Sequence, residues 1–385
     1  MIYFDNAATT PVRKEVFTAM KPYFSTYFGN PSSLHAKGLE ARDAVEEARK
    51  LIAEILNCAT DELIFTSGGT ESVNLAIKGI AFARKKGHII TQKTEHDAVL
   101  ETCKWLEKQG FELTYLNVDE FGLVKPEQVE KHIRKDTILV SIMYANNEIG
   151  TIQPIKEIAE VCRKHEVLFH TDACQAAGYL DMDVKNLGID LMTINGSKIY
   201  GPKGVGLLFI KKGIEIEPLL HGGGQEYGLR SGTENVPAIV GFAKALELAQ
   251  KEKVTEVQRL TALQDRLVSG LQRIADSKLN GHPQKRLPNN VNVSIYGVEG
   301  EAVLLMLNEK GICASTGSAC STKSLEASHV LLAMGMSHEM AHGSLRFSLG
   351  KHTKEKDISR LMKVLPGIVK KLRDMSPIKA EVRNG

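Results

Sequence analysis

Residues 189–210 read IDLMTINGSKIYGPKGVGLLFI, in which two apolar runs enclose a polar turn. Short apolar runs bounded by Gly and Pro are typical of strands buried in a sheet. Lys198 follows the first of these runs directly, where loss of hydration favours the neutral amine that forms imines with aldehydes. We therefore predict that Lys198 holds an aldehyde cofactor as a Schiff base. Lys203 lies in Gly-Pro-Lys-Gly and is expected to be an ordinary turn residue.

The sequence before and around this segment alternates between apolar stretches and segments with helical periodicity. Strands that alternate with helices predict an α/β fold with a mostly parallel sheet flanked by helices. Seven apolar stretches are expected to form this sheet: 63–65, 88–91, 113–116, 138–143, 167–170, 190–194 and 205–210.

The pattern changes to a long helical stretch over residues 236–279, which is expected to bridge two domains. We place the large, cofactor-binding domain at 16–255 and a smaller α+β domain at 256–385. The first 15 residues are expected to pack with the small domain. Pro366-Gly367 should kink or split the last helix.

Composition excludes several classes of protein. A net charge of +3 is too small to indicate nucleic-acid binding, and no apolar run reaches the roughly 18–20 residues that a membrane span needs. The first residues contain no apolar signal-peptide core. The six cysteines show no CxxC motif and are expected to be free thiols, which predicts a cytoplasmic location.

Two polar segments at the ends of predicted strands indicate where a cofactor binds. Residues 65–72 read FTSGGTES and open a helix, so backbone N–H groups and hydroxyls can form an anion site. The segment matches neither a Walker A loop nor a dinucleotide fingerprint, and a simple helix N-cap is the alternative. Asp172 follows the strand predicted at 167–170 and would keep a pyridine-type ring nitrogen protonated. For this aspartate, too, a helix N-cap is the alternative.

Two further residues in the C-terminal third point to substrate chemistry. Residues 313–324 read CASTGSACSTKS and are expected to form a mobile loop. An exposed Cys320 thiol near Lys323 would populate the nucleophilic thiolate. Arg346 interrupts a strand pattern and is suited to clamp a carboxylate, with an ion pair on the sheet as the alternative.

Motifs along the whole chain resemble the cysteine desulfurases, which are pyridoxal-phosphate enzymes of aminotransferase class V. The long serine-rich loop is similar to the iron–sulfur-assembly type of that family, rather than to the type with a shortened loop. The matching segments are YFDNAATTP at 3–11, FGNPSSLH at 28–35, FTSGGTES at 65–72, KTEHDAV at 93–99, ANNEIGTIQPI at 145–155, HTDACQAAG at 170–178, KIYGPKGVG at 198–206, HGGGQEYGLRSGTENV at 221–236, STGSACSTKSLEASHVLLAMG at 315–335 and SLRFSLG at 344–350.

The resemblance implies the aminotransferase fold type I and a role for each matching position. Lys198 would bind the cofactor covalently, Asp172 would pair with its ring nitrogen, and His96 would stack on the ring. The other implied cofactor contacts are Asn147, Gln175, Gly69, Thr70, Asn195 and Ser197, with Thr233 supplied by the second subunit of a homodimer.

The implied reaction converts L-cysteine to L-alanine and leaves the sulfur on Cys320 as a persulfide. Arg346, Asn147 and Ala8 would bind the substrate, while Lys198 and His96 would move protons. An iron–sulfur scaffold protein or a tRNA-thiolation relay would then take the sulfur. No metal site of the chain's own is expected, although Cys320 would ligate an iron–sulfur cluster transiently together with a scaffold.

Two other functions are alternatives. The first is a selenocysteine lyase or another β-eliminating class V enzyme. The second, outside enzymes, is a cofactor-binding regulator or assembly scaffold without activity.

Two positions depart from the family pattern. The chain reads Asn195-Gly196-Ser197-Lys198 where the iron–sulfur-assembly enzymes commonly read Ser-Gly-His-Lys, so we expect weaker cofactor retention with an unchanged reaction. Cys174 stands where Thr or Ala is usual, and its rigid position suits packing better than sulfur delivery.

Overall fold

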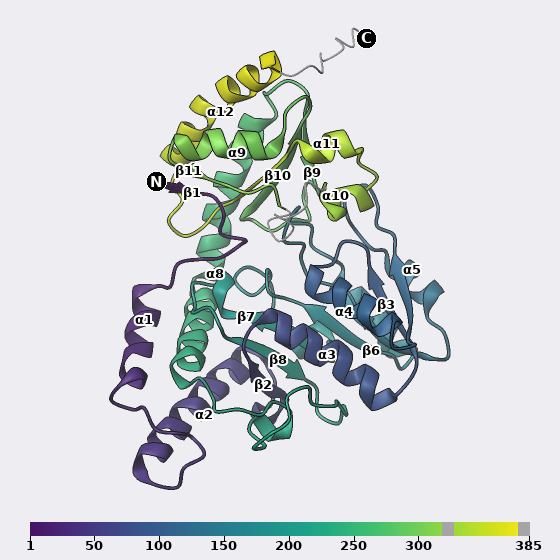
Figure 1. Ribbon diagram of the computed structural model, residues 1–385, viewed down its shortest axis with the longest axis vertical. Helices are drawn as coiled ribbons and strands as arrows, with labels where there is room; N and C mark the ends of the chain where they lie inside the picture. The colour runs from purple at the N-terminus through teal and green to yellow at the C-terminus, as the bar shows by residue number, and fades with distance from the viewer. Residues whose placement is uncertain (318–326, 376–385) are drawn as a thin grey trace.

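The computed structural model describes residues 1–317 and 327–375, and it has two parts joined by the long helix α8 (Val236–Leu271) (Figure 1). The lower part in Figure 1 is built on a seven-stranded sheet. Its strands, in spatial order, are β2 (Leu63–Thr66), β8 (Gly206–Ile210), β7 (Leu191–Asn195), β6 (Leu168–Asp172), β5 (Thr137–Ser141), β3 (His88–Gln92) and β4 (Glu112–Leu116). Only β8 runs against its neighbours, so the predicted mostly parallel α/β sheet is confirmed.

Both faces of this sheet are buried because successive strand residues point to opposite sides. In β2, for example, Leu63 and Phe65 belong to one apolar cluster and Ile64 belongs to the other. The helices that contribute to the first cluster are α1 (Lys14–Met20), α2 (Ala36–Leu56), α5 (Pro126–His132), α6 (Ile155–Lys164), α7 (Val184–Leu187) and the first half of α8. The helices that contribute to the second cluster are α3 (Gly69–Arg84) and α4 (Asp97–Glu107).

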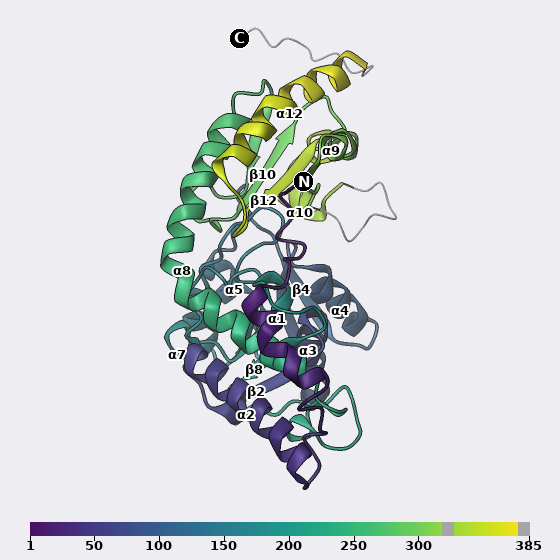
Figure 2. The ribbon, with the colours of Figure 1, turned by 90° about the vertical axis from the view of Figure 1, so that its left-hand side faces the viewer.

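The upper part has a separate apolar core around a three-stranded antiparallel sheet. Its strands are β9 (Ser277–Asn280), β10 (Asn290–Ile295) and β12 (Ser344–Ser348), with β10 in the centre. Its helices are α9 (Gly300–Glu309), α10 (His329–Ala333), α11 (His338–His342) and α12 (Glu355–Met375). Figure 2 shows α8 passing from this part into the lower one.

The N-terminal segment also contacts the upper part. Strand β1 (Ile2–Tyr3) pairs in parallel with β11 (Ile312–Cys313), and Phe4 is buried in the upper core. The predicted domain boundary at 255–256 lies within α8, between its residues packed in the lower core and those packed in the upper core. That division of the chain stays a prediction.

Two predicted helices differ from the structure: the long one is shorter than predicted, and the last one is not split, while the predicted kink at Pro366 stays a prediction. The helix predicted over 236–279 ends at Leu271, and Ser277–Asn280 instead forms the edge strand β9 after a turn in which Asp276 has a φ of 54°. Helix α12 is not split at Pro366, because proline removes only one intrahelical bond and Leu361, Leu365 and Ile368 hold the helix on the upper core. Within the described residues, no helix is long and apolar enough to cross a membrane.

Candidate active site

A cavity of about 240 Å³ lies at the carboxyl ends of the central parallel strands. Asp172 ends β6 and Asn195 ends β7, and the carboxyl edge of a parallel sheet is where α/β proteins place their ligands. Strand β12 of the upper sheet contributes Arg346, so the cavity draws on both parts of the molecule. Its lining is Ala7, Ala8, Gly69, Thr70, His96, Ala98, Met143, Ala145, Asn147, Asp172, Cys174, Gln175, Asn195, Lys198, Gly317 and Arg346.

One corner of the cavity is the start of helix α3. The first N–H groups of an α-helix have no acceptor within the helix, so Gly69 and Thr70 present donors and a positive helix end to the cavity. Gly68 has a φ of 154°, and a Cβ on Gly206 would approach the Gly68 backbone to 2.6 Å. Glycine is therefore required at both positions for the turn to pass this close to β8. This corner is suited to bind a phosphate.

Asp172 forms the far wall of the cavity and is almost fully buried. Its Oδ1 accepts a hydrogen bond from the Cys174 amide at 2.9 Å, which orients the carboxylate. Two residues earlier in β6, and so on the same face of the sheet, His170 bonds to Ser141 Oγ and Thr193 Oγ1 on the neighbouring strands. Burial lowers the pKa of His170 to about 4, so a neutral imidazole lies beneath the Asp172 carboxylate at neutral pH.

Lys198 lies in the short helix η3 (Gly196–Lys198), and its Nζ donates to the Ala8 carbonyl. Thr10 ties this segment to the N-terminal residues of the chain, because its amide and its hydroxyl both donate to Ser197 O at 2.9 Å. Thr10 Oγ1 also accepts the Tyr200 amide at 2.8 Å. The N-terminal segment therefore helps to place the lysine in the cavity.

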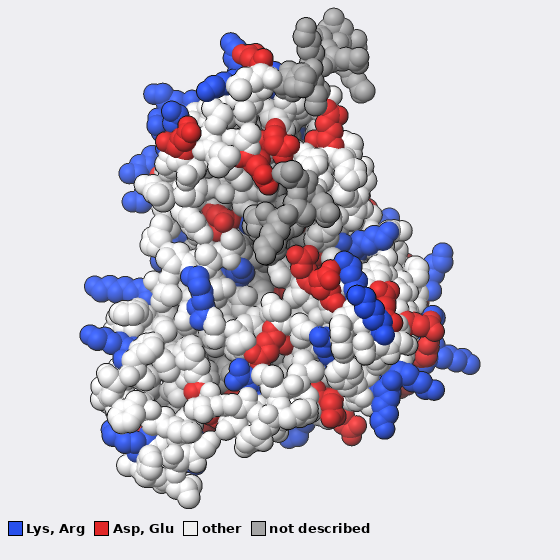
Figure 3. Space-filling view, in the orientation of Figure 1, with Lys and Arg blue, Asp and Glu red and all other residues white. Residues whose placement is uncertain are grey.

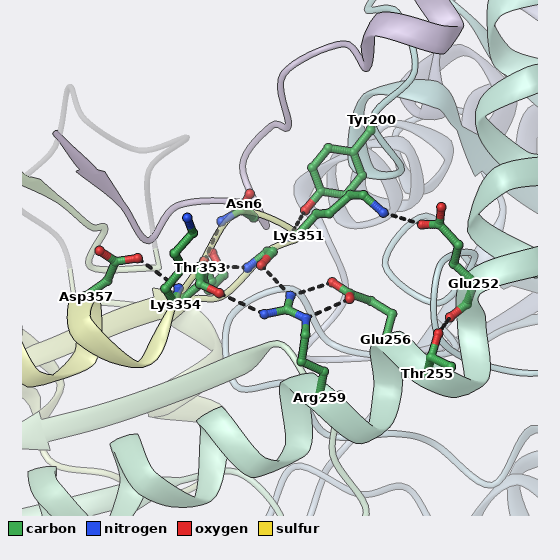
Figure 4. A network of polar contacts seen from close by, with 12 residues as sticks. Asn6, Tyr200, Glu252, Thr255, Glu256, Arg259, Lys351, Thr353, Lys354 and Asp357 are labelled. Atoms are coloured by element: carbon green, nitrogen blue, oxygen red, sulfur yellow. Dashed lines mark hydrogen bonds and ion pairs between the residues drawn. The ribbon is translucent and has the colours of Figure 1, made fainter.

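Tyr200 extends this arrangement to the upper part of the molecule (Figure 4). Its hydroxyl accepts the Lys351 amide at 2.6 Å, and its backbone has a φ of 65°. Arg259 of α8 donates to the carbonyls of Gly350 and Thr353 at 2.9 and 2.8 Å and forms a two-point ion pair with Glu256. The turn after β12, the strand that carries Arg346, is thus fixed to α8 and to the segment that carries Lys198.

Arg346 is buried, and its guanidinium group is held on two sides. Nη1 donates to Asn147 O and Nη2 pairs with Asp5 Oδ1, both at 2.9 Å. Nε has no partner among the described residues. Arg346 also lines the cavity, where its guanidinium is suited to bind a carboxylate.

His96 caps helix α4, and its Nδ1 accepts the Ala98 amide at 3.0 Å. A neutral imidazole that accepts at Nδ1 carries its proton on Nε2. Next to it, Glu95 is fully buried and accepts at Oε1 from the Met143 amide and from Gln92. Burial raises the pKa of Glu95 to about 8.

Cys174 is buried in the wall of the cavity. Burial and the nearby Asp172 carboxylate raise the pKa of its thiol well above the usual value, so the thiol stays protonated. A Cβ on Gly69 would lie 2.9 Å from the Cys174 sulfur. The side chain therefore packs against the phosphate corner.

The structure brings most of the predicted site residues to this one cavity. The predicted residues in the lining are Ala8, Gly69, Thr70, His96, Asn147, Asp172, Gln175, Asn195, Lys198 and Arg346. Ser197 is not among the described lining residues, and its hydroxyl lies 3.5 Å from Asn195 Oδ1. Thr233 is exposed outside the cavity, and Cys320 lies outside the described residues.

Sequence reasoning missed Asp5, Thr10 and Tyr200, which hold the site residues in place. All three lie within motifs used for the family resemblance, YFDNAATTP and KIYGPKGVG. The motifs marked the positions but gave no sign of their partners, because the partners are up to 341 residues away in the chain.

The family model described as "Aminotransferase class-V" matches residues 2–361. The chain belongs to the aminotransferase class V family. Among its class V relatives is a protein of Methanosarcina thermophila named "Cysteine desulfurase IscS", which is 58% identical over 98% of this chain and 94% of that protein. A solved structure titled "NIFS-LIKE PROTEIN" superposes with a TM-score of 0.88 at 40% identity, covering 97% of this chain and 98% of the other. Another, titled "SspA in complex with cysteine", has a TM-score of 0.79 at 40% identity and covers 91% and 99%.

Class V enzymes depend on pyridoxal phosphate, and the cavity fits this group. Its three chemical requirements are a primary amine, a carboxylate and an anion site, and Lys198, Asp172 and the Gly69–Thr70 corner supply them. A further side chain at residue 69 would meet both Cys174 and Asn195, so the corner is shaped for a ligand to approach the backbone. The described residues contain no group of three or more His, Cys, Asp and Glu side chains that could hold a metal ion.

Proposed function

We infer that this protein is a cysteine desulfurase, which converts L-cysteine to L-alanine and transfers the sulfur to Cys320. The observation that carries this is the convergence of Lys198, Asp172 and Arg346 on one cavity from three separate strands or their ends. The relatives named cysteine desulfurase support the same reaction over nearly the full chain.

We propose a role for each group around the substrate. The Arg346 guanidinium binds the substrate carboxylate, with Asn147 and Ala8 beside it. Pyridoxal phosphate, when bound, supplies an electron sink that makes the α-proton of an attached amino acid acidic. Lys198 takes that proton, and the Asp172 carboxylate holds a proton on the ring nitrogen. The remaining cofactor contacts proposed are Gly69, Thr70, Gln175, Asn195 and Ser197.

The sulfur step needs a nucleophile and an acid. We propose that the Cys320 thiolate attacks the substrate sulfur, so that an S–S bond forms while the carbon–sulfur bond breaks. The electron pair stays with the carbon skeleton, which is protonated to give L-alanine, and Cys320 keeps the sulfur as a persulfide. His96, with its proton on Nε2, is positioned in the lining to deliver or accept protons during these steps.

Mass analysis of the purified holoenzyme after treatment with L-cysteine tests this function. We expect the peptide that contains Cys320 to gain one sulfur atom and L-alanine to appear in equal amount. The variant Cys320→Ala should gain no sulfur. Persistence of the added sulfur in that variant, or its absence from the unmodified protein, would contradict the assignment.

We propose that the working form is a homodimer in which Thr233 of one subunit reaches the cofactor phosphate of the other. Large apolar side chains are exposed along α1, the short helix η1 (Lys21–Phe24) and the connection to α2, with Phe24 at 62% and Phe28 at 67% exposure. Figure 3 shows few charged side chains over this lower left area. An exposed apolar surface of this kind is typical of a subunit interface.

A second exposed segment contains both an aromatic side chain and Thr233. Tyr227 is 55% exposed, and the Arg49 guanidinium of α2 lies over its ring, 5.2 Å from the ring centre. Thr233 is exposed in the same segment, six residues further along the chain. We propose that a second copy of the chain covers this segment as well as the apolar side chains of α1 and η1.

We propose an iron–sulfur scaffold protein or a tRNA-thiolation relay as the acceptor of the sulfur. The support is the similarity to relatives named IscS and the long serine-rich segment that carries Cys320. Transient ligation of an iron–sulfur cluster by Cys320 would occur in the complex with such a scaffold. We also propose a cytoplasmic location, because the five cysteines among the described residues are free thiols.

A further inference from the structure

Glu148 contacts both described ends of the segment that contains Cys320. Its Oε2 accepts a hydrogen bond of 2.5 Å from the hydroxyl of Ser328, two residues past that segment. On the other side, Gly317 packs so closely that a Cβ there would lie 3.1 Å from the same oxygen. Glu148 is 3% exposed, so both contacts are made where little water can replace them.

The backbone of Glu148 is itself fixed. Asn146 Oδ1 accepts the amides of Glu148 and Ile149 at 2.8 and 2.9 Å, and Asn146 Nδ2 donates to Thr94 O at 2.8 Å. From the upper sheet, Asn292 Nδ2 donates to Glu148 O at 3.1 Å. The carboxylate therefore projects from a turn that is held on both sides.

This turn belongs to the same structure as the cavity. Asn147 lies between Asn146 and Glu148 and accepts the Arg346 guanidinium at its carbonyl. The residue after Ser328, His329, bonds through Nε2 to the carbonyl of Glu95, next to His96. The residues that follow the Cys320 segment are therefore bonded to Glu148 and Glu95, each of which is next in sequence to a residue that lines the cavity.

The N-terminal end is held in a similar way. Ser315 and Arg346 exchange backbone hydrogen bonds of 3.2 and 2.6 Å, and the Gly317 amide donates to Ser315 Oγ at 3.1 Å. Gly317 itself lines the cavity. Glu148 is the side chain that touches both ends, and it is not among the described lining residues.

We propose that Glu148 is a positioning residue for sulfur transfer. By bonding to Ser328 and packing beside Gly317 at the edge of the cavity, it sets where the Cys320 thiol meets the substrate sulfur as the S–S bond forms and the carbon–sulfur bond breaks. This inference rests on the proposed role of Cys320. Because Glu148 does not face the substrate, its loss should slow sulfur transfer without weakening substrate binding.

Ser337 provides a matched control for Ser328. Both serines cap five-residue helices, and both accept a backbone amide at 3.3 Å, from Leu331 for Ser328 and from Met340 for Ser337. Only Ser328 also donates to Glu148. Ser328 is buried and Ser337 is exposed, so the difference between Ser328→Ala and Ser337→Ala reports the buried contact with the carboxylate in addition to the helix cap.

The experiment is single-turnover persulfide formation on Cys320, measured by mass analysis of quenched holoenzyme after mixing with L-cysteine. We expect Glu148→Ala and Ser328→Ala to slow it on the order of tenfold relative to Ser337→Ala. Glu148→Gln, whose amide oxygen can still accept from Ser328, should fall in between. The double variant Glu148→Ala, Ser328→Ala should be no slower than the slower single variant, because both substitutions remove the same hydrogen bond. The KM for L-cysteine and the absorbance change of the bound cofactor on adding L-cysteine should stay within about twofold of the unmodified enzyme.

Equal rates in Ser328→Ala, Glu148→Ala and Ser337→Ala would overturn the positioning role, as would an effect confined to KM. If the unmodified enzyme placed no sulfur on Cys320, the proposed function would fail first, so the two failures are distinct. Thermal unfolding and cofactor absorbance identify a variant that has not folded, and the near-isosteric Glu148→Gln then decides the result.

Discussion

Glu95 is the residue whose burial has the clearest consequence for stability. In the unfolded chain its carboxyl group titrates near the model value of 4.5, whereas burial raises the pKa in the folded protein to about 8. Between these values the unfolded state releases a proton that the folded state keeps, so folding stability falls as pH rises through this window. Oε2 has no partner among the described residues that would favour the charged form.

We predict that Glu95→Gln leaves the unfolding free energy nearly unchanged at pH 5 and raises it by a few kcal/mol at pH 9. The amide can keep the bond to the Met143 amide while removing the charge. Thermal or denaturant unfolding across this pH range measures the effect, with Glu101→Gln, an exposed glutamate on α4, as control. If the unfolding free energy of Glu95→Gln fell with rising pH as much as that of the unmodified protein, the prediction would be contradicted.

Helix α8 is the element that connects the two parts of the site. Its residue Arg259 holds the turn after β12 through the carbonyls of Gly350 and Thr353. Because β12 carries Arg346, the position of the carboxylate-binding group depends on Arg259 of α8, which lies more than 80 residues earlier in the chain. Tyr200 adds the Lys198 segment to the same junction.

We predict that Arg259→Ala lowers the unfolding free energy by roughly 2 kcal/mol, because the carbonyls of Gly350 and Thr353 each lose a hydrogen bond from a charged donor. The KM for L-cysteine should rise about three- to tenfold, because the turn after the strand that carries Arg346 is no longer fixed to α8. Steady-state kinetics and thermal unfolding measure both. Arg266→Ala, on the same helix with a half-exposed pair to Glu355, should cost less than about 1 kcal/mol and leave KM unchanged. Indistinguishable effects of the two substitutions would show that the junction does not position Arg346.

At the scale of the whole molecule, the exposed apolar surface on α1, η1 and the connection to α2 should be covered by a second subunit. Without that subunit, Phe24 and Phe28 would face water, and the proposed contact of Thr233 with the phosphate could not form. Assembly and cofactor binding are therefore expected to be coupled.

We predict that Phe24→Glu combined with Phe28→Glu halves the mass in solution, because two buried charges oppose association, and reduces bound pyridoxal phosphate severalfold. Light scattering after gel filtration and cofactor absorbance measure the two effects. Leu305→Glu, at a 70% exposed site on α9 of the upper part, is the control and should change neither. An unchanged mass in the double variant would place the interface elsewhere.

The sequence by itself determined the parallel sheet, the lysine after β7 and the family. Apolar runs separated by helical periods require a sheet buried on both faces, and ordered motifs from residue 3 to 350 specify the class V resemblance. Local chemistry also predicted Asp172 at a strand end and an anion site at a helix start, because each depends only on neighbouring residues.

Only the tertiary structure decided how these residues are held. The bonds from Arg346 to Asp5, from Thr10 to Ser197 and from Glu148 to Ser328 each join segments at least 180 residues apart, and no periodicity or spacing encodes such pairs. Likewise, the end of α8 at Leu271 and the unbroken α12 depend on packing in the upper core, which outweighs the local preferences of single residues. Local sequence selects the chemical groups, and burial among distant segments sets their positions and their ionisation.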